Sequence, residues 1–244
     1  MDLITTKPVG LSVAETLAYD HTSDTPSLYF HWPFCPYKCT FCPFVALVGQ
    51  DQHMAVYHQA LCQELLNFSR QYTGQRQLAS VFIGGGTPST YPPELLLDMF
   101  AILKREFELS STTEVVLEVN PGTVTPAGIA AWQAAGINRL SIGVQSLKNQ
   151  VLQAFNRQHD VAAVYQALEQ VAAVTANLSI DLILGLPGVS AAEWQSFIRE
   201  VVTWPIKHLS LYFLTIHEGT PLFFDVRRKR IKLPQDELLA ELYD

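Results

Sequence analysis

Strand-like and helical patterns alternate along most of this chain, and the alternation limits the folds that it can adopt. Short apolar runs with the length and composition of buried strands lie at 28–32, 78–83, 114–119, 139–144, 178–184 and 208–214. Segments with helical periodicity separate them, at about 51–72, 93–107, 126–135, 148–174 (with a break near Gln158) and 191–204. Apolar strands joined by helices indicate an α/β fold with a parallel sheet. About six units predict an incomplete (β/α)6 barrel, and an open doubly wound sheet is the alternative.

Helix boundaries in this pattern carry their own signals. Thr125 before Pro126 and Ser190 before Ala191 are good helix starts, and Gly136 is a good helix stop. We predict a polar N-terminal extension over 1–26, a core over 27–222 and the start of a further C-terminal region over 223–244.

Charge and apolar patterning exclude several classes of protein. The formal net charge of −7 gives no basic footprint for nucleic acid. The N-terminus lacks a basic region followed by an apolar core, so no signal peptide is expected. The longest apolar stretches carry Asn177 and Asp181, so no membrane span is expected either. A cytoplasmic location fits these features.

Cys35, Cys39 and Cys42 form a Cys-x3-Cys-x2-Cys motif directly after the first predicted strand. Soft thiolates select iron–sulfur clusters or zinc, and three of them can hold a [4Fe–4S] cluster with one iron left open. A structural zinc site completed by His31, or a chance clustering of core cysteines, would explain the same residues. Cys62 lies in an apolar helical pattern and is expected to be a buried small hydrophobe.

Further polar residues follow other predicted strands, where the sites of parallel α/β proteins lie. The segment 84–88, Gly-Gly-Gly-Thr-Pro, can let a ligand approach closely and leave amides free for a carboxylate, or can be a tight turn. Glu118 ends an apolar strand, and a salt bridge to Arg139 or Arg157 would account for it. Asp181, flanked by apolar residues, must find hydrogen bonds inside the barrel.

The cysteine loop, with Phe41 before its last cysteine, resembles the radical S-adenosylmethionine superfamily. Residues 29–35 and six motifs in order over about 27–222 resemble the oxygen-independent coproporphyrinogen III oxidase group, which includes haem chaperones. The resemblance implies a [4Fe–4S] cluster on the three cysteines, bound S-adenosylmethionine, a flavodoxin or ferredoxin as electron donor, and a tetrapyrrole or haem ligand. It also implies cofactor-binding roles for Tyr29, Phe41, Gly85, Gly86, Thr87, Glu118, Gln145, Arg157 and Asp181.

In that family the reduced cluster splits S-adenosylmethionine to a 5′-deoxyadenosyl radical, which in the oxidase starts decarboxylation of porphyrinogen propionates. Two departures bear on the activity. The oxidase has a fourth cysteine at the position of Phe44. A phenylalanine there is the pattern of the haem-chaperone branch, so the resemblance implies a haem chaperone. The alternative function is that of a coproporphyrinogen III dehydrogenase. The chain ends at Asp244, where the group's C-terminal region is expected to begin, so neither the region that closes the site in the oxidase nor the haem motif of the chaperones can be assigned on this sequence.

Two remaining features are expected to be solvent-exposed. The basic run 227–232 is predicted to be a solvated linker, or alternatively a contact for tetrapyrrole propionates. His53 and His58 lie on a predicted helix and are expected at its surface.

Overall fold

The structure is a computed structural model that describes residues 25–243. The N-terminal extension predicted over 1–26 therefore lies almost entirely outside the described residues. Within the described part, no helix is long and apolar enough to cross a membrane.

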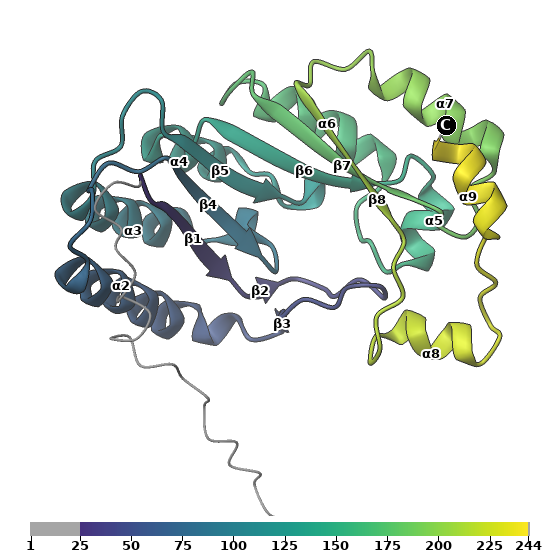
Figure 1. The fold of residues 1–244 in the computed structure, drawn as a ribbon, viewed down its shortest axis with the longest axis horizontal. Helices are drawn as coiled ribbons and strands as arrows, with labels where there is room; N and C mark the ends of the chain where they lie inside the picture. Colours follow the sequence, from purple (N-terminus) through teal and green to yellow (C-terminus); the bar gives the residue numbers. More distant parts are fainter. Residues whose placement is uncertain (1–24, 244) are drawn as a thin grey trace, which may run out of the picture.

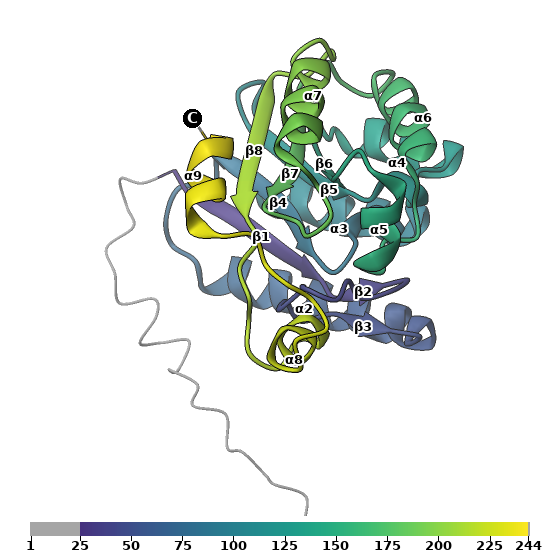
Figure 2. The same cartoon turned by 90° about the vertical axis from the view of Figure 1, so that its right-hand side faces the viewer.

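A six-stranded parallel sheet forms the centre of the molecule. Its strands are β1 (Ser27–Trp32), β4 (Ser80–Gly85), β5 (Glu114–Val119), β6 (Arg139–Gln145), β7 (Leu178–Leu184) and β8 (His208–Phe213). They lie in sequence order, each beside the next, and among the described residues β1 and β8 are not paired with each other. Figures 1 and 2 show the sheet curving with its helices on the outer face. The predicted incomplete barrel is therefore confirmed, and the doubly wound alternative, which needs helices on both faces, is excluded.

The connecting helices match the predicted segments closely. They are α2 (Met54–Gln71), α3 (Pro93–Glu106), α4 (Pro126–Ala135), α5 (Asn149–Ala154), α6 (Val161–Val171) and α7 (Ala191–Val201). Short 3-10 turns η1 (Asp51–His53), η2 (Pro88–Thr90) and η3 (Pro121–Thr123) complete the connections.

Three predicted helix boundaries have the expected capping interactions. The Thr125 side chain accepts from the amide of Gly128, and Ser190 forms a capping box with Glu193. Gly136 ends α4 in the left-handed conformation, with φ of 88°. These local caps explain why the boundaries could be read from the sequence.

The two faces of the sheet have different chemistry. On the outer face, residues such as Val115, Leu117 and Leu140 are buried against the helices. On the inner face, the alternating residues include Glu118, Ser141 and others with polar side chains. A curved sheet with helices on one side leaves its concave side as a place for a ligand.

Two strands and two helices were not predicted from the sequence. β2 (Phe34–Cys35) and β3 (Leu47–Val48) form a small parallel pair that closes the loop after β1. The helices α8 (Pro221–Arg227) and α9 (Asp236–Tyr243) follow β8. Strands of two residues are too short to show periodicity. The core was predicted to end at residue 222, which lies inside α8.

The expectation that His58 is exposed is wrong. Its side chain is buried between α2 and α3, whereas His53 is exposed as predicted. His58 lies on the inward face of α2 together with Cys62 and Leu65, and hydrogen bonds satisfy its ring nitrogens. A histidine with partners can be buried at moderate cost, and the helical pattern alone did not reveal those partners.

Candidate functional site at the carboxyl edge of the sheet

A cavity of about 390 Å³ opens where the parallel strands end. Its lining is drawn from the loop after β1, the turn after β4 and the ends of β5, β6, β7 and β8. All of the predicted site residues line this cavity except Tyr29. Tyr29 lies on β1, where its ring stacks on Phe82 and its hydroxyl bonds the Nδ1 of His31 at 3.0 Å.

The three cysteines come from one loop that is anchored at several points. Cys35 ends β2, and its thiol lies 2.6 Å from the carbonyl oxygen of Tyr37 and 3.0 Å from the hydroxyl of Thr87. The amide of Cys42 donates to the carbonyl of Cys39 at 3.2 Å. Burial raises the pKa of the Cys42 thiol, although a hydrogen bond with the backbone of Phe44 opposes this shift. Bound metal would reverse that pKa shift by stabilising the thiolate.

The glycine-rich turn brings two backbones into close approach. A Cβ at Gly86 would lie 2.5 Å from the carbonyl oxygen of Pro33, and Gly85 has φ of +122°. The amide of Gly86 donates to the carbonyl of Trp32 at 2.8 Å, and that of Thr87 donates to Phe34 at 2.9 Å.

The amide of Gly85 is also occupied, because it donates to the Oε2 of Glu118 at 3.1 Å. The expectation that the amides of this turn are free for a carboxylate is therefore wrong for Gly85, Gly86 and Thr87. These residues attach the turn to the cysteine loop and to β5.

Glu118 faces the cavity without a cationic partner in the described part of the chain. Arg139 pairs with Glu114 instead, at 3.1 Å, and among the described residues no ion pair joins Glu118 to Arg139 or Arg157, so the salt-bridge alternative does not account for Glu118. The pKa of the Glu118 carboxyl is raised to about 7, chiefly by burial and also by the charge of Asp181, while the hydrogen bond from the Gly85 amide acts in the opposite direction.

Arg157 and Asp181 bring opposite charges to the same cavity. Arg157 donates from Nη1 to the sulfur of Cys39 at 3.6 Å and from Nη2 to the carbonyl of Gly143. Its Nε is buried without a hydrogen-bond partner among the described residues. Asp181 accepts from the hydroxyl of Ser141 at 3.2 Å, as its buried position requires, and burial raises its pKa.

Gln145 completes the set at the end of β6. Its φ is 69°, in the left-handed region that residues other than glycine seldom adopt, and the register between β6 and β7 shifts at this point. Backbone conformations of this kind are concentrated at functional sites.

Comparison with known proteins supplies the family. Residues 29–201 match the model of the Radical SAM superfamily. The chain belongs to the radical SAM superfamily. Its relatives include the mitochondrial radical S-adenosyl methionine domain-containing protein 1 of Bos taurus, 35% identical over 91% of this chain and 50% of that protein. Heme chaperone HemW of Bacillus subtilis is 33% identical over 89% of this chain and 58% of that protein.

Among solved structures, coproporphyrinogen III oxidase HemN from Escherichia coli, described as a radical SAM enzyme, superposes with a TM-score of 0.79. It is 27% identical, and the match covers 92% of this chain and 52% of that one. The chain spans about half the length of these relatives. Membership of the radical SAM superfamily implies a [4Fe–4S] cluster and S-adenosylmethionine.

The side chains of this radical SAM site fit those two groups. Thiolates on one tetrahedral zinc ion lie about 3.8 Å apart, as Zn–S bonds of about 2.3 Å require. The three loop sulfurs are not all within 4.8 Å of one another, since the group that meets this limit among the described residues is His58, Cys62 and Asp98. His31 bonds Tyr29 and the carbonyl of Val45 rather than joining the thiols. The three sulfurs are therefore not set closely enough for one zinc ion, and three thiols are the number that a cluster with one open iron takes. The Nε of Arg157, without a partner among the described residues, suits an anionic group.

Tyr37 and Asn120, which sequence analysis did not assign, also line the radical SAM cavity, and His159 contacts Asn120. The Nδ2 of Asn120 donates to the hydroxyl of Tyr37 at 2.6 Å, and its Oδ1 lies 3.2 Å from the Nδ1 of His159. Burial lowers the pKa of His159 to about 4, and the neighbouring Arg157 acts in the same direction, so this histidine stays neutral at pH 7. Asn120 and His159 could have been found from the sequence only by their positions within family motifs. Tyr37 lies between two of the cysteines and has no sequence pattern of its own.

A second cluster, His58, Cys62 and Asp98, lies away from the cavity. His58 bonds the hydroxyl of Tyr91 at 2.8 Å through Nδ1 and Asp98 at 3.0 Å through Nε2. The sulfur of Cys62 lies 3.7 and 3.6 Å from the two ring nitrogens, so it sits beside the ring and off the lone pair of either. The cluster links α2, α3 and the segment before α3, and Cys62 is buried as predicted.

The raised pKa of Glu118 makes the stability of the cofactor-free protein depend on pH. Its folded pKa of about 7 lies above the ordinary 4.5, so the folded state holds the proton more tightly than the unfolded state. Its contribution to the free energy of unfolding is therefore fully present below pH 4.5 and is lost as pH rises through 7. We expect Glu118→Gln to be more stable than wild type by about 2 to 3 kcal/mol at pH 8, with a much smaller difference at pH 4.5.

Urea unfolding of both proteins at the two pH values checks this expectation. His159 titrates in both proteins and does not sense Glu118, so its contribution cancels in the comparison. Asp181 repels the Glu118 carboxylate, so the loss of that repulsion is part of the measured difference. A difference between the two proteins that does not grow between pH 4.5 and pH 8 would contradict the assignment.

Proposed function

We propose that this chain is the radical SAM part of a protein of haem or tetrapyrrole metabolism, most similar to the haem chaperones. Cys35, Cys39 and Cys42 would hold a [4Fe–4S] cluster, and S-adenosylmethionine would occupy the same cavity. The observation that carries this proposal is that one cavity at the strand ends gathers the three thiols, Arg157 and the carboxyl groups of Glu118 and Asp181. Residues 27–222 would form the core, and residues from 223 would begin a C-terminal region.

The cavity residues bind and orient, and none is needed as a general base. When bound and reduced, the cluster supplies one electron that cleaves a carbon–sulfur bond of S-adenosylmethionine. Arg157, with its unpartnered Nε, would stabilise the cysteine thiolates or a ligand carboxylate. Glu118 and Asp181 would accept hydrogen bonds from the amino or hydroxyl groups of S-adenosylmethionine. The wall of the cavity would be shaped by Gly85, Gly86, Thr87 and Gln145. Phe41 would pack beside the cofactor, and Tyr29 would help to bind the cofactor from its place on β1.

Two observations favour the haem-chaperone branch. HemW proteins are among the relatives with 30% identity or more, and Phe44 lines the cavity where the oxidase pattern has a fourth cysteine. Phe44 is 65% exposed, so it presents an apolar ring at the mouth of the cavity. Such a surface suits a flat apolar ligand such as haem.

The second candidate is a coproporphyrinogen III dehydrogenase, which would convert propionates to vinyl groups. The superposition on HemN with a TM-score of 0.79 favours it. For either candidate, we propose a flavodoxin or ferredoxin as the electron donor and the reducing cytoplasm as the location. We also propose that the protein has no nucleic-acid partner. The net charge of −7 supports the last point.

Anaerobic reconstitution with iron and sulfide tests the proposal. We expect about four irons per chain, as a three-thiolate cubane requires. Adding S-adenosylmethionine to the reduced protein should change its electron paramagnetic resonance signal and yield 5′-deoxyadenosine. An assay with coproporphyrinogen III then separates the two candidates, since the dehydrogenase predicts loss of carbon dioxide from the propionates and the haem chaperone does not. The proposal would be refuted if S-adenosylmethionine left the electron paramagnetic resonance signal of the reconstituted, reduced protein unchanged.

A further inference from the structure

The basic residues after β8 form a compact positive surface on an otherwise acidic protein. We call Arg227, Arg228, Lys229, Arg230 and Lys232 the basic end of α8, and all of them are exposed. The formal charge of the whole chain is −7, so this surface has the opposite sign to the average. The prediction that this run is solvated is confirmed, although Arg227 belongs to α8 rather than to a linker.

Most of this positive charge is not neutralised within the described residues. Arg230 pairs with Asp225 at 3.2 Å, and among the described residues no other member of the basic end forms an ion pair. The guanidinium groups of Arg227 and Arg228 lie 5.6 and 5.9 Å from the ring centroids of Phe223 and Phe224. These rings hold the arginines in place while leaving their charge available to an outside partner.

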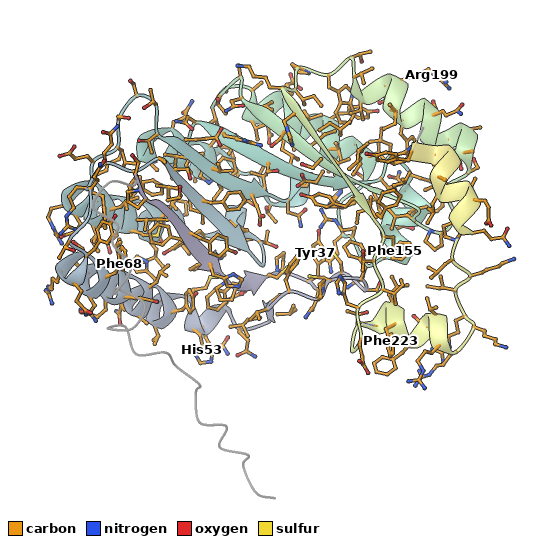
Figure 3. The ribbon with its side chains drawn as sticks, viewed as in Figure 1. Tyr37, His53, Phe68, Phe155, Arg199 and Phe223 are labelled. Atoms are coloured by element: carbon orange, nitrogen blue, oxygen red, sulfur yellow. The ribbon has the colours of Figure 1, made fainter. Side chains whose placement is uncertain are left out.

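The helix that leads into the basic end is fixed to the cysteine loop at its first turn. The amide of Leu222, in the first turn of α8, donates to the carbonyl of Thr40 at 3.0 Å, between Cys39 and Cys42. The side chain of Leu222 is fully buried in an apolar cluster with Phe155, and Phe41 packs against that cluster. Figures 1 and 2 show α8 beside the loop that joins β2 and β3, and Figure 3 shows Phe223 on the same side.

The basic end lies outside the cavity, because none of its residues is part of the cavity lining. A ligand held in the cavity would not need to contact these charges, which argues against propionate groups as their partner. A protein that covered the cysteine loop from outside would meet them. Charges placed around such a contact steer an oppositely charged partner and raise its association rate.

We propose that the basic end of α8 is the docking surface for a small acidic one-electron carrier protein, a ferredoxin or flavodoxin. This inference rests on the proposed function, because it assigns the route by which the cysteine-bound cluster is reduced. The reduced carrier loses one electron and the cluster gains it, with no transfer of atoms. Docking next to the Cys39–Cys42 segment brings the carrier to the part of the loop that holds two of the three thiols.

Charge reversal tests this surface. Arg227→Glu together with Arg228→Glu should lower the second-order rate of cluster reduction by reduced flavodoxin at least tenfold at low salt. The difference should shrink as salt is raised, since salt screens exposed charges. The matched control reverses Arg199 and Lys207, which are exposed on α7 and before β8, far from the mouth. Figure 3 shows Arg199 at the opposite side of the molecule from Phe223.

The rates are measured by anaerobic stopped flow on the reconstituted chain, with reduced methyl viologen as the small reductant. Methyl viologen should reduce all variants at the same rate, and Arg227→Lys with Arg228→Lys should retain the wild-type rate with flavodoxin. Equal slowing in the control and test variants would overturn the proposal. Binding of the basic end to anionic phospholipid vesicles, with unchanged reduction by flavodoxin, would overturn it in favour of a membrane surface. Failure of methyl viologen to reduce any variant would instead refute the proposed function.

Discussion

Replacing Cys39 with alanine is expected to abolish iron and sulfide incorporation, from about four irons per chain to almost none. Cys39 is the buried member of the motif, and Arg157 donates to its sulfur at 3.6 Å. Removing it leaves two thiolates, and an open cluster site with only two protein ligands loses its attachment. Iron and labile-sulfide analysis after anaerobic reconstitution, with the absorption near 400 nm, measures the effect. Cys35→Ala and Cys42→Ala should behave in the same way.

Cys62→Ala is the matched control for this experiment. Cys62 is also buried and also a free thiol, but it lies against His58 between α2 and α3, away from the cavity. The variant should keep the full iron content. Stoichiometric zinc without labile sulfide in the wild-type protein, or retention of the cluster in Cys39→Ala, would contradict the assignment of the ligands.

The second large effect is expected for Gly86→Ala. The added Cβ would lie 2.5 Å from the carbonyl oxygen of Pro33 and 2.7 Å from that of Phe34. Both obstacles are backbone atoms that also anchor the cysteine loop, so they cannot move without disturbing Cys35. We expect a loss of about 3 kcal/mol in the free energy of unfolding, which is at the upper end for overpacking. Binding of S-adenosylmethionine to the reconstituted protein should weaken as well.

Gly49→Ala provides the comparison for Gly86→Ala. Gly49 has φ of +67°, and a Cβ there would meet no atom within 4 Å, so only backbone strain is introduced. That strain costs about 1 kcal/mol. Urea unfolding of the three proteins checks the difference. Equal losses for the two variants would mean that the approach between the glycine-rich turn and the cysteine loop is not rigid.

Local signals account for the parts of the fold that sequence analysis predicted well. The strands β5 and β7 and the helix α4 have the predicted bounds, because apolar runs and caps such as Thr125 and Gly136 are local properties. The break between α5 and α6 was also predicted, near Gln158. The strands β2 and β3 were missed because two residues are too few to carry a pattern.

The sequence predicted the contacts within the site less well than it predicted the fold. The sequence placed the cysteines, the glycine-rich turn, Glu118, Arg157 and Asp181 after or within predicted strands, and parallel topology then requires them to share an edge. It did not reveal that the Gly85 amide is already occupied by Glu118, or that Arg139 pairs with Glu114. Hydrogen-bond partners across a sheet depend on register, which periodicity does not encode.

By itself, the sequence determined the alternation of strands and helices, the three-thiol loop and the membership of a superfamily, because each depends on residue type and spacing along the chain. The tertiary structure decided which groups became partners. It buried His58 against Asp98 and Tyr91, left the Nε of Arg157 without a partner among the described residues, and attached the first turn of α8 to Thr40. The last contact joins residues 40 and 222, and only the closure of the chain around the sheet brings such distant positions together.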